Sequence, residues 1–195
     1  GVKANIKVKF APTAAGNFTG QLIYVTGADS TVVELIGTAY EAQIAPFAED
    51  FESGSFETNN WFVVNGTQNN QWFVGTALDD TDNLSAIISN DGGLTNAYTI
   101  SGACVTHFYA DIAIPDGDTL GDIKLFFDWK ALGEGFGSYP YDYLRVFMFE
   151  PTITPVAGTQ LSTGNINDDR FNGQDTWQSF TYDIPAEYFG TTKRL

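Results

Sequence analysis

Two groups of acidic residues in this chain could bind a hard cation. Asp50 and Glu52 are two residues apart, which places both carboxylates on one side of an extended segment. The alternative group is Asp79, Asp80 and Asp82, in a short loop that lacks the spacing of an EF-hand. Calcium takes roughly six to eight oxygen ligands, many of them carboxylates. We therefore predict a structural calcium ion at the first pair, against the plainer alternative that both groups are solvated acidic turns.

A glycine-rich loop over residues 133–141 could bind a ligand through aromatic rings. Flat rings pack against the apolar faces of sugars, and loop residues are often the ones that carry function. Glu134 and Asp142 could instead form an acid pair for glycoside cleavage, although glycines and aromatic residues also suit a plain turn. We expect a contact surface for a glycan or a protein, formed by Glu134, Phe136, Tyr139 and Tyr141.

Trp61 and Trp72 are further candidates for stacking against a sugar. Tryptophan residues in a β-sandwich belong to the core more often than to an exposed platform. The two tyrosines that flank Pro140 are therefore expected to be more exposed than either tryptophan.

No set of residues in the sequence predicts catalysis. His107 is the only histidine, and the chain has no G-x-S-x-G elbow that would bring a serine nucleophile to it. Cys104 is the only cysteine, so no disulfide can form within the chain, and its small neighbours suit a buried side chain. We predict that the chain is not an enzyme.

The charge of the chain excludes several classes of partner. The formal net charge is −15, and residues 41–195 carry six basic against 22 acidic side chains. Such an acidic surface repels nucleic acid and anionic lipid. No run of about 18 apolar residues could insert into a membrane. These properties fit a soluble surface domain.

The candidate site residues lie on or between short segments that alternate apolar and polar residues and are separated by turn signals. This pattern predicts an all-β fold. Two of the segments, 123–130 and 142–150, are apolar on both faces, which is typical of strands in the middle of a sheet. The expected strands are 5–10, 21–26, 31–38, 60–65, 71–76, 84–89, 96–100, 105–114, 123–130, 142–150 and 177–184.

The strand pattern divides the chain into two domains joined by a linker. Residues 1–40 hold three strands, whereas an immunoglobulin-like sandwich has about seven, so we expect them to be the C-terminal strands of such a domain. Residues 41–48 read as the linker. Residues 49–195 carry the many short strands of a jelly-roll β-sandwich, which we expect to be incomplete at its C-terminal end.

The first domain resembles the end of immunoglobulin-like repeats in large bacterial surface proteins. The repeats follow the pattern F-x-P-T-x-x-G-x-F-x-G-x-L and close on L-x-G-T-A. The matching residues are Phe10, Pro12, Thr13, Gly16, Phe18, Gly20, Leu22, Leu35, Gly37, Thr38 and Ala39.

The second domain resembles choice-of-anchor J and cleaved-adhesin modules, which belong to the same jelly-roll group as MAM domains. The matching segments are 50–54, Trp61, Trp72, Gly75, 85–93, 125–130, 133–134, 141–143, 155–159 and Trp177. The resemblance implies a non-catalytic segment of a large multidomain adhesin exported by type IX secretion. It implies neighbouring domains and the secretion machinery as partners. A carbohydrate-binding accessory module of a secreted hydrolase is the alternative.

The resemblance points to the gram-negative bacterial group that uses type IX secretion, and this group attaches O-linked glycans to short acceptor triplets that begin with aspartate. Two such triplets occur, at residues 29–31 and 118–120, and both fall in expected turns. The resemblance therefore implies Ser30 and Thr119 as candidate O-glycosylation sites.

Overall fold

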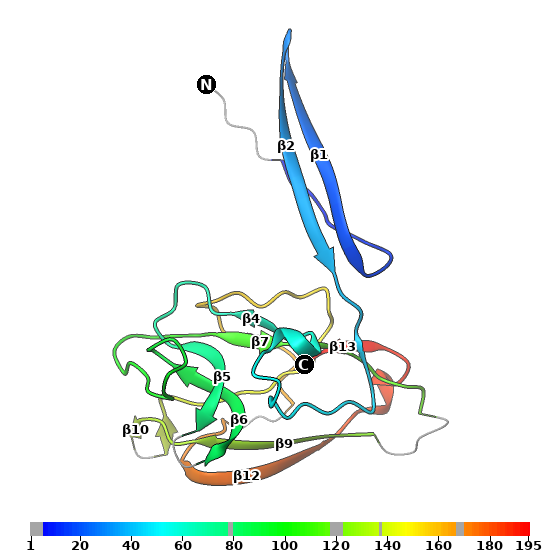
Figure 1. The fold of residues 1–195 in the computed structure, drawn as a ribbon. Helices are drawn as coiled ribbons and strands as arrows, with labels where there is room; N and C mark the ends of the chain where they lie inside the picture. Colours follow the sequence, from blue (N-terminus) through cyan, green and yellow to red (C-terminus); the bar gives the residue numbers. More distant parts are fainter. Residues whose placement is uncertain (1–5, 78–79, 118–122, 137, 167–169) are drawn as a thin grey trace. The chain divides into compact units, whose positions relative to one another are not determined.

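The computed structural model describes residues 6–77, 80–117, 123–136, 138–166 and 170–195, and the side chains of residues 80–82 and 136 also lie outside the description. Regular structure in these ranges is β-strand, apart from two single-turn 3-10 helices, η1 (Glu57–Asn59) and η2 (Ala186–Tyr188). The all-β prediction is confirmed. The chain divides into two compact units, Gly1–Glu41 and Ala42–Leu195 (Figure 1).

The first unit contains one long antiparallel hairpin of β1 (Gly16–Thr26) and β2 (Asp29–Ala39). The expected strands at 21–26 and 31–38 both form and extend further. The expected strand at 5–10 is wrong over its described residues, 6–10, which have no strand pairing. Instead the Phe10 ring covers Gly37, where a Cβ atom would lie 2.6 Å from a ring carbon. An alternating pattern predicts which residues share a face, but a strand also needs a neighbour.

Large apolar side chains are exposed on the hairpin. The exposed fractions are 56% for Ile23, 63% for Val25 and 79% for Ile36. These three residues share one face, and Tyr24, which is 54% exposed, lies on the opposite face. A two-stranded hairpin is marginally stable by itself, because it buries too little apolar surface.

A three-stranded sheet joins distant parts of the second unit. Its order is β13 (Thr192–Arg194), β8 (Asp111–Ala113) and β3 (Gln43–Ile44), with β13 antiparallel and β3 parallel to β8. The expected linker of residues 41–48 is therefore shorter in the structure. Its later residues belong to the second unit, since β3 pairs with β8 and Phe47 packs against the core.

The remaining strands of the second unit form antiparallel pairs. β4 (Phe62–Val64) pairs with β7 (His107–Tyr109), and β5 (Gln71–Ala77) pairs with β6 (Asp80–Ser89). β9 (Lys124–Ala131) pairs with β12 (Gln174–Asp183). The short hairpin of β10 (Gly135–Phe136) and β11 (Tyr139–Pro140) completes the set. Several small sheets of this kind are consistent with a β-sandwich.

Two of the strands expected in the second unit are wrong. Residues 96–100 are irregular. Residues 142–150 form isolated bridges at Leu144, Phe147 and Phe149 rather than a continuous strand. Among the described residues β9 has β12 as its one strand neighbour, so it is not central to a sheet. The apolar residues of 142–150 are buried by packing rather than by regular pairing.

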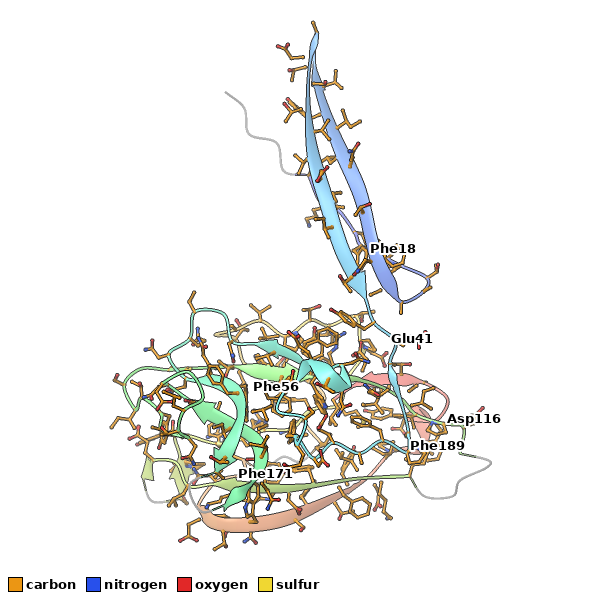
Figure 2. The ribbon with its side chains drawn as sticks, viewed as in Figure 1. Phe18, Glu41, Phe56, Asp116, Phe171 and Phe189 are labelled. Carbon is orange, nitrogen blue, oxygen red and sulfur yellow. The ribbon has the colours of Figure 1, made fainter. Side chains whose placement is uncertain are left out.

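Two apolar clusters form the core of the second unit. One contains Phe56 and Trp61, with Trp72 and Phe108 packed against it. The other contains Ile114, Met148, Ile166 and Ile184, and Leu195 packs against both clusters. Phe171 packs against the rings of Phe127, Trp129 and Phe180, and Phe127 and Phe180 also pack against the second cluster. Figure 2 shows Phe56 near η1 and Phe171 near β9 and β12.

Candidate functional site

The hairpin of β10 and β11 closes into a braced loop, called here the contact loop (residues 133–142). The backbone oxygen of Glu134 accepts hydrogen bonds from the amides of Tyr141 (2.9 Å) and Asp142 (3.2 Å). In return, the Glu134 amide donates to Asp142 Oδ2 at 3.1 Å. Gly133 lies so close to Asp142 that a Cβ atom there would be 2.4 Å from the Asp142 Cβ. The base of the loop is therefore closed from both sides.

Asp142 also ties the contact loop to two distant segments. Tyr98 lies beside the Asp142 carboxylate. Burial raises the pKa of Tyr98 above its ordinary value, and the neighbouring Asp142 carboxylate raises it further. The side-chain amide of Asn172 donates to the Asp142 backbone oxygen. Asp142 therefore holds the base of the loop in place, and its carboxylate already accepts the Glu134 amide.

The contact loop exposes two phenol rings. Tyr139 is 72% exposed and Tyr141 is 61% exposed, as the flanking Pro140 led us to expect. The Arg170 guanidinium lies 4.5 Å from the ring centroid of the neighbouring Tyr143. Glu134 is exposed as well, and Phe136 has its side chain outside the described part of the chain. This surface can stack on flat groups, donate hydrogen bonds and accept them.

The structure changes the geometry expected for Asp50 and Glu52. Phe51 has a φ of 60°, and the Gly54 amide donates to the Phe51 oxygen at 3.0 Å, so the segment turns instead of extending. Asp50 Oδ1 accepts the Glu52 amide at 3.1 Å, and Glu52 Oε1 accepts the Leu84 amide at 2.8 Å. Both carboxylates therefore bond backbone amides. The expectation that they face one side of an extended segment is wrong.

The oxygen atoms available around Asp50 and Glu52 fit a calcium ion poorly. Within the described ranges, no group of three or more His, Cys, Asp or Glu side chains is placed to hold a metal ion. Two carboxylates fall well short of the roughly six to eight oxygens that calcium takes. Of the alternative group, Asp79 and the side chains of Asp80 and Asp82 lie outside the described residues.

The candidate glycosylation sites are also placed only in part. Ser30 is exposed, but it is the second residue of β2 rather than part of the turn. Thr119 lies outside the described residues.

The histidine and the two tryptophans have structural roles. His107 Nε2 lies 3.0 Å from the Thr159 oxygen and 3.3 Å from the Val156 oxygen, so it fastens the loop that contains both. Trp61 is buried and its Nε1 donates to Glu49 Oε2 at 3.0 Å. Trp72 donates through Nε1 to the Thr106 oxygen at 3.3 Å. Trp61 is a core residue and Trp72 packs, partly buried, against the core, so the expectation that both tyrosines are more exposed than either tryptophan is confirmed.

A polar depression beside Cys104 has a cavity volume of about 210 Å³ and is lined by residues 67–70 and 101–104. Its amide groups hold the surrounding loops together. Asn70 exchanges two hydrogen bonds with the Thr99 backbone, of 2.9 and 2.7 Å, and the Cys104 thiol donates to the Asn70 oxygen at 3.3 Å.

Sequence reasoning missed the residues that brace the contact loop. Tyr98 and Asn172 are far from Asp142 in the chain, and no local pattern links them. It also missed the exposure of Phe126 and Trp177, which are 67% and 43% exposed. The alternation of residues 124–130 puts Phe126 on the face opposite Trp129. This pattern was the signal from which the exposure of Phe126 could have been predicted.

Among the described residues, no helix is long and apolar enough to cross a lipid bilayer. No family model, curated protein or solved structure matches the chain. The likeness to adhesin modules therefore stays a prediction from sequence.

Proposed function

We propose that residues 42–195 form a non-catalytic binding module of a secreted or cell-surface adhesin, which holds a glycan or protein surface with its contact loop. The observation that carries this proposal is the pair of exposed rings, Tyr139 and Tyr141, on a loop braced at its base. Large exposed aromatic side chains cost little conformational entropy on binding, since they have few rotatable bonds.

The contacts that hold the base of the contact loop support a binding role for its exposed rings. The base of the contact loop is held by backbone bonds at Glu134 and by contacts of Tyr98 and Asn172 with Asp142. A loop ordered before binding loses less freedom when a ligand arrives, so more of the contact energy appears as affinity.

The proposal also covers the neighbouring domain, the export route and the location of the protein. The first unit exposes apolar side chains on both faces of its hairpin, which supports further strands of a neighbouring domain covering it. Export by type IX secretion and contact with the secretion machinery follow from the sequence resemblance. The acidic surface suits a protein that must stay soluble outside the cell.

The proposal is tested by binding the labelled chain to arrays of immobilised glycans and extracellular-matrix proteins. Variants Tyr139→Ala and Tyr141→Ala, alone and together, are compared with the unchanged chain. The matched control is Tyr24→Ala, which removes a tyrosine of similar exposure (54%) from the other unit. We expect the double variant to lose binding and the control to keep it.

A carbohydrate-binding accessory module of a secreted hydrolase is the second candidate. It is supported by the exposed rings of Phe126 and Trp177, which lie beside polar side chains on β9 and β12. Sugar sites combine such rings with hydrogen-bonding groups.

Calcium binding stays a prediction, with Asp50 and Glu52 or the alternative group Asp79, Asp80 and Asp82 as its ligands. A bound ion stabilises the folded state by mass action, so millimolar calcium is expected to raise the melting temperature. The measurement compares thermal unfolding in calcium and in EDTA. The variants Asp50→Asn/Glu52→Gln and Asp80→Asn/Asp82→Asn identify the site, because the one that removes the ligands should abolish the difference. Equal melting temperatures of the unchanged chain in calcium and in EDTA would contradict the prediction.

A further inference from the structure

The outer face of β9 and β12 carries two aromatic rings with polar side chains between them. The register pairs Asp128 with Ser179 and Phe126 with Thr181. Side chains alternate along each strand, so these four point to the same side. Trp177 lies two residues before Ser179, within the irregular part of β12, and its ring is exposed. All five are exposed. Figure 1 shows β9 and β12 along the lower edge of the second unit.

The two rings are far apart along the strands. Phe126 lies opposite Thr181, and Trp177 is four residues before Thr181 on the same strand. Four residues of extended strand span about 13 Å, which is the approximate separation of the two rings along the strands. A register shift lies between Gln174 and Gln178, and such bulges re-aim the side chains beside them. The rings therefore mark the two ends of an elongated strip.

Hydrogen-bonding groups occupy the middle of this strip. Ser179 Oγ donates to Asp128 Oδ1 at 2.5 Å, which fixes the carboxylate and leaves the hydroxyl oxygen as an acceptor. Thr181 adds a second exposed hydroxyl next to Phe126, and Lys124 forms an ion pair with Asp183 beyond it. Ring, polar group and ring alternate along the strip.

The size of the strip decides what kind of partner it fits. Two strands of this length offer a face of about 25 by 10 Å. A stable protein–protein interface covers about 800 Å² on each partner. The strip is too narrow for a second copy of the chain or for another folded protein, but it matches a single extended chain of sugar rings.

The charge of the protein decides between polysaccharides. The strip itself carries Lys124 and Lys130 beside Asp128 and Asp183, so it is the net charge of the whole chain, −15, that repels polysaccharides with uronate or sulfate groups. A neutral chain avoids this repulsion. A flat, extended β-1,4-linked chain presents apolar pyranose faces to both rings, whereas a curved α-linked chain cannot reach both.

We propose that the outer face of β9 and β12 binds a neutral, extended β-linked polysaccharide, with Phe126 and Trp177 stacking on sugar rings and Asp128, Ser179 and Thr181 bonding its hydroxyls. This inference rests on the second candidate function, whose two rings it assigns to a class of polysaccharide, and it does not depend on the contact loop.

The test is isothermal titration calorimetry of the whole 195-residue chain with cellohexaose and with N-acetylchitohexaose. Maltohexaose and polygalacturonate serve as curved and anionic controls. Phe126→Ala and Trp177→Ala should each weaken binding about tenfold, while Phe126→Trp and Trp177→Tyr should keep it. Melting temperatures should change little, because both side chains are exposed.

The contact-loop variant Tyr139→Ala/Tyr141→Ala separates the two proposals. It should bind the hexasaccharide as the unchanged chain does, even where it loses binding on the arrays. The inference is overturned if neither β-linked hexasaccharide binds at millimolar concentration, or if the double variant Phe126→Ala/Trp177→Ala binds unchanged. Self-association that these substitutions abolish, without sugar binding, would overturn it in favour of a second copy.

Discussion

At the scale of single residues, one carboxylate holds the loop that follows β6. Asp91 accepts hydrogen bonds from the Ser89 hydroxyl (2.6 Å), the Thr95 hydroxyl (2.7 Å) and the Thr95 amide (3.0 Å). Ser89 is fully buried and its hydroxyl oxygen accepts the Gly93 amide at 3.0 Å. The Ser89 and Thr95 bonds lower the pKa of Asp91 from 3.8 to about 2. The ionised form is therefore the one that the folded loop needs.

Asp91 should make stability depend on pH in the acid range. Because folding lowers its pKa, its contribution is complete above pH 3.8 and is lost as the pH falls to about 2. We expect Asp91→Asn to lower the melting temperature at pH 6 and to differ little from the unchanged chain at pH 2. Thermal unfolding followed by circular dichroism at several pH values measures the difference in melting temperature between the variant and the unchanged chain. The other carboxylates are the same in both proteins, so their titration cancels in this difference. A deficit that stays constant with pH would contradict the assignment.

Sequence reasoning found the exposed residues of the contact loop but not its brace. Glycines and Pro140 signal a loop, and this local signal was enough to predict that Tyr139 and Tyr141 are exposed. The contact of Tyr98 with Asp142 joins residues that are distant in sequence. Such contacts depend on how the whole chain folds, so composition and spacing could not predict them.

At the scale of elements, β13 fastens the second unit through two buried cations. Arg194 bonds both oxygens of Asp111, at 2.7 and 2.9 Å, and donates to the Ile153 oxygen at 2.7 Å. Lys193 pairs with Glu150 and lies 4.3 Å from the ring centroid of Tyr188. Both cations are buried, at 7% and 8% exposure. β13 therefore links β8 to the segment around residue 150.

Removal of the Arg194 guanidinium should destabilise the second unit strongly. The partly buried Asp111 would lose its bidentate partner, and we expect Arg194→Ala to cost about 3 kcal/mol. The matched control is Lys124→Ala, which breaks the exposed ion pair with Asp183 and should cost less than about 1 kcal/mol. Urea denaturation measures both. Equal effects would show that β13 does not fasten the unit.

Strand prediction succeeded where an alternating segment has a neighbouring strand to pair with, and it failed where no such neighbour lies alongside among the described residues. The hairpins of β1 with β2 and of β5 with β6 combine alternation with turn residues, and both form. Residues 142–150 are as apolar as a central strand, yet they make only isolated bridges. Apolar residues on both faces specify burial, whereas pairing depends on which backbone lies alongside.

At the scale of the whole molecule, the two units should differ in stability. The second unit has two apolar clusters, while the hairpin of the first exposes Ile23, Val25 and Ile36. We expect amides of β1 and β2 to exchange with solvent much faster than those of β8 and β13. Hydrogen–deuterium exchange of the whole chain, read by mass spectrometry, measures this. Equal protection in both units would mean that the hairpin is stable without further strands.

The central claim is that Tyr139 and Tyr141 bind a surface ligand from a braced loop, and array binding by the double alanine variant tests it most directly. The account predicts that a glycan or matrix protein bound by the unchanged chain and by Tyr24→Ala loses about 90% or more of its signal with Tyr139→Ala/Tyr141→Ala, since each ring contributes on the order of 1 kcal/mol. Equal binding by all three proteins, or no bound ligand for the unchanged chain, would contradict the account.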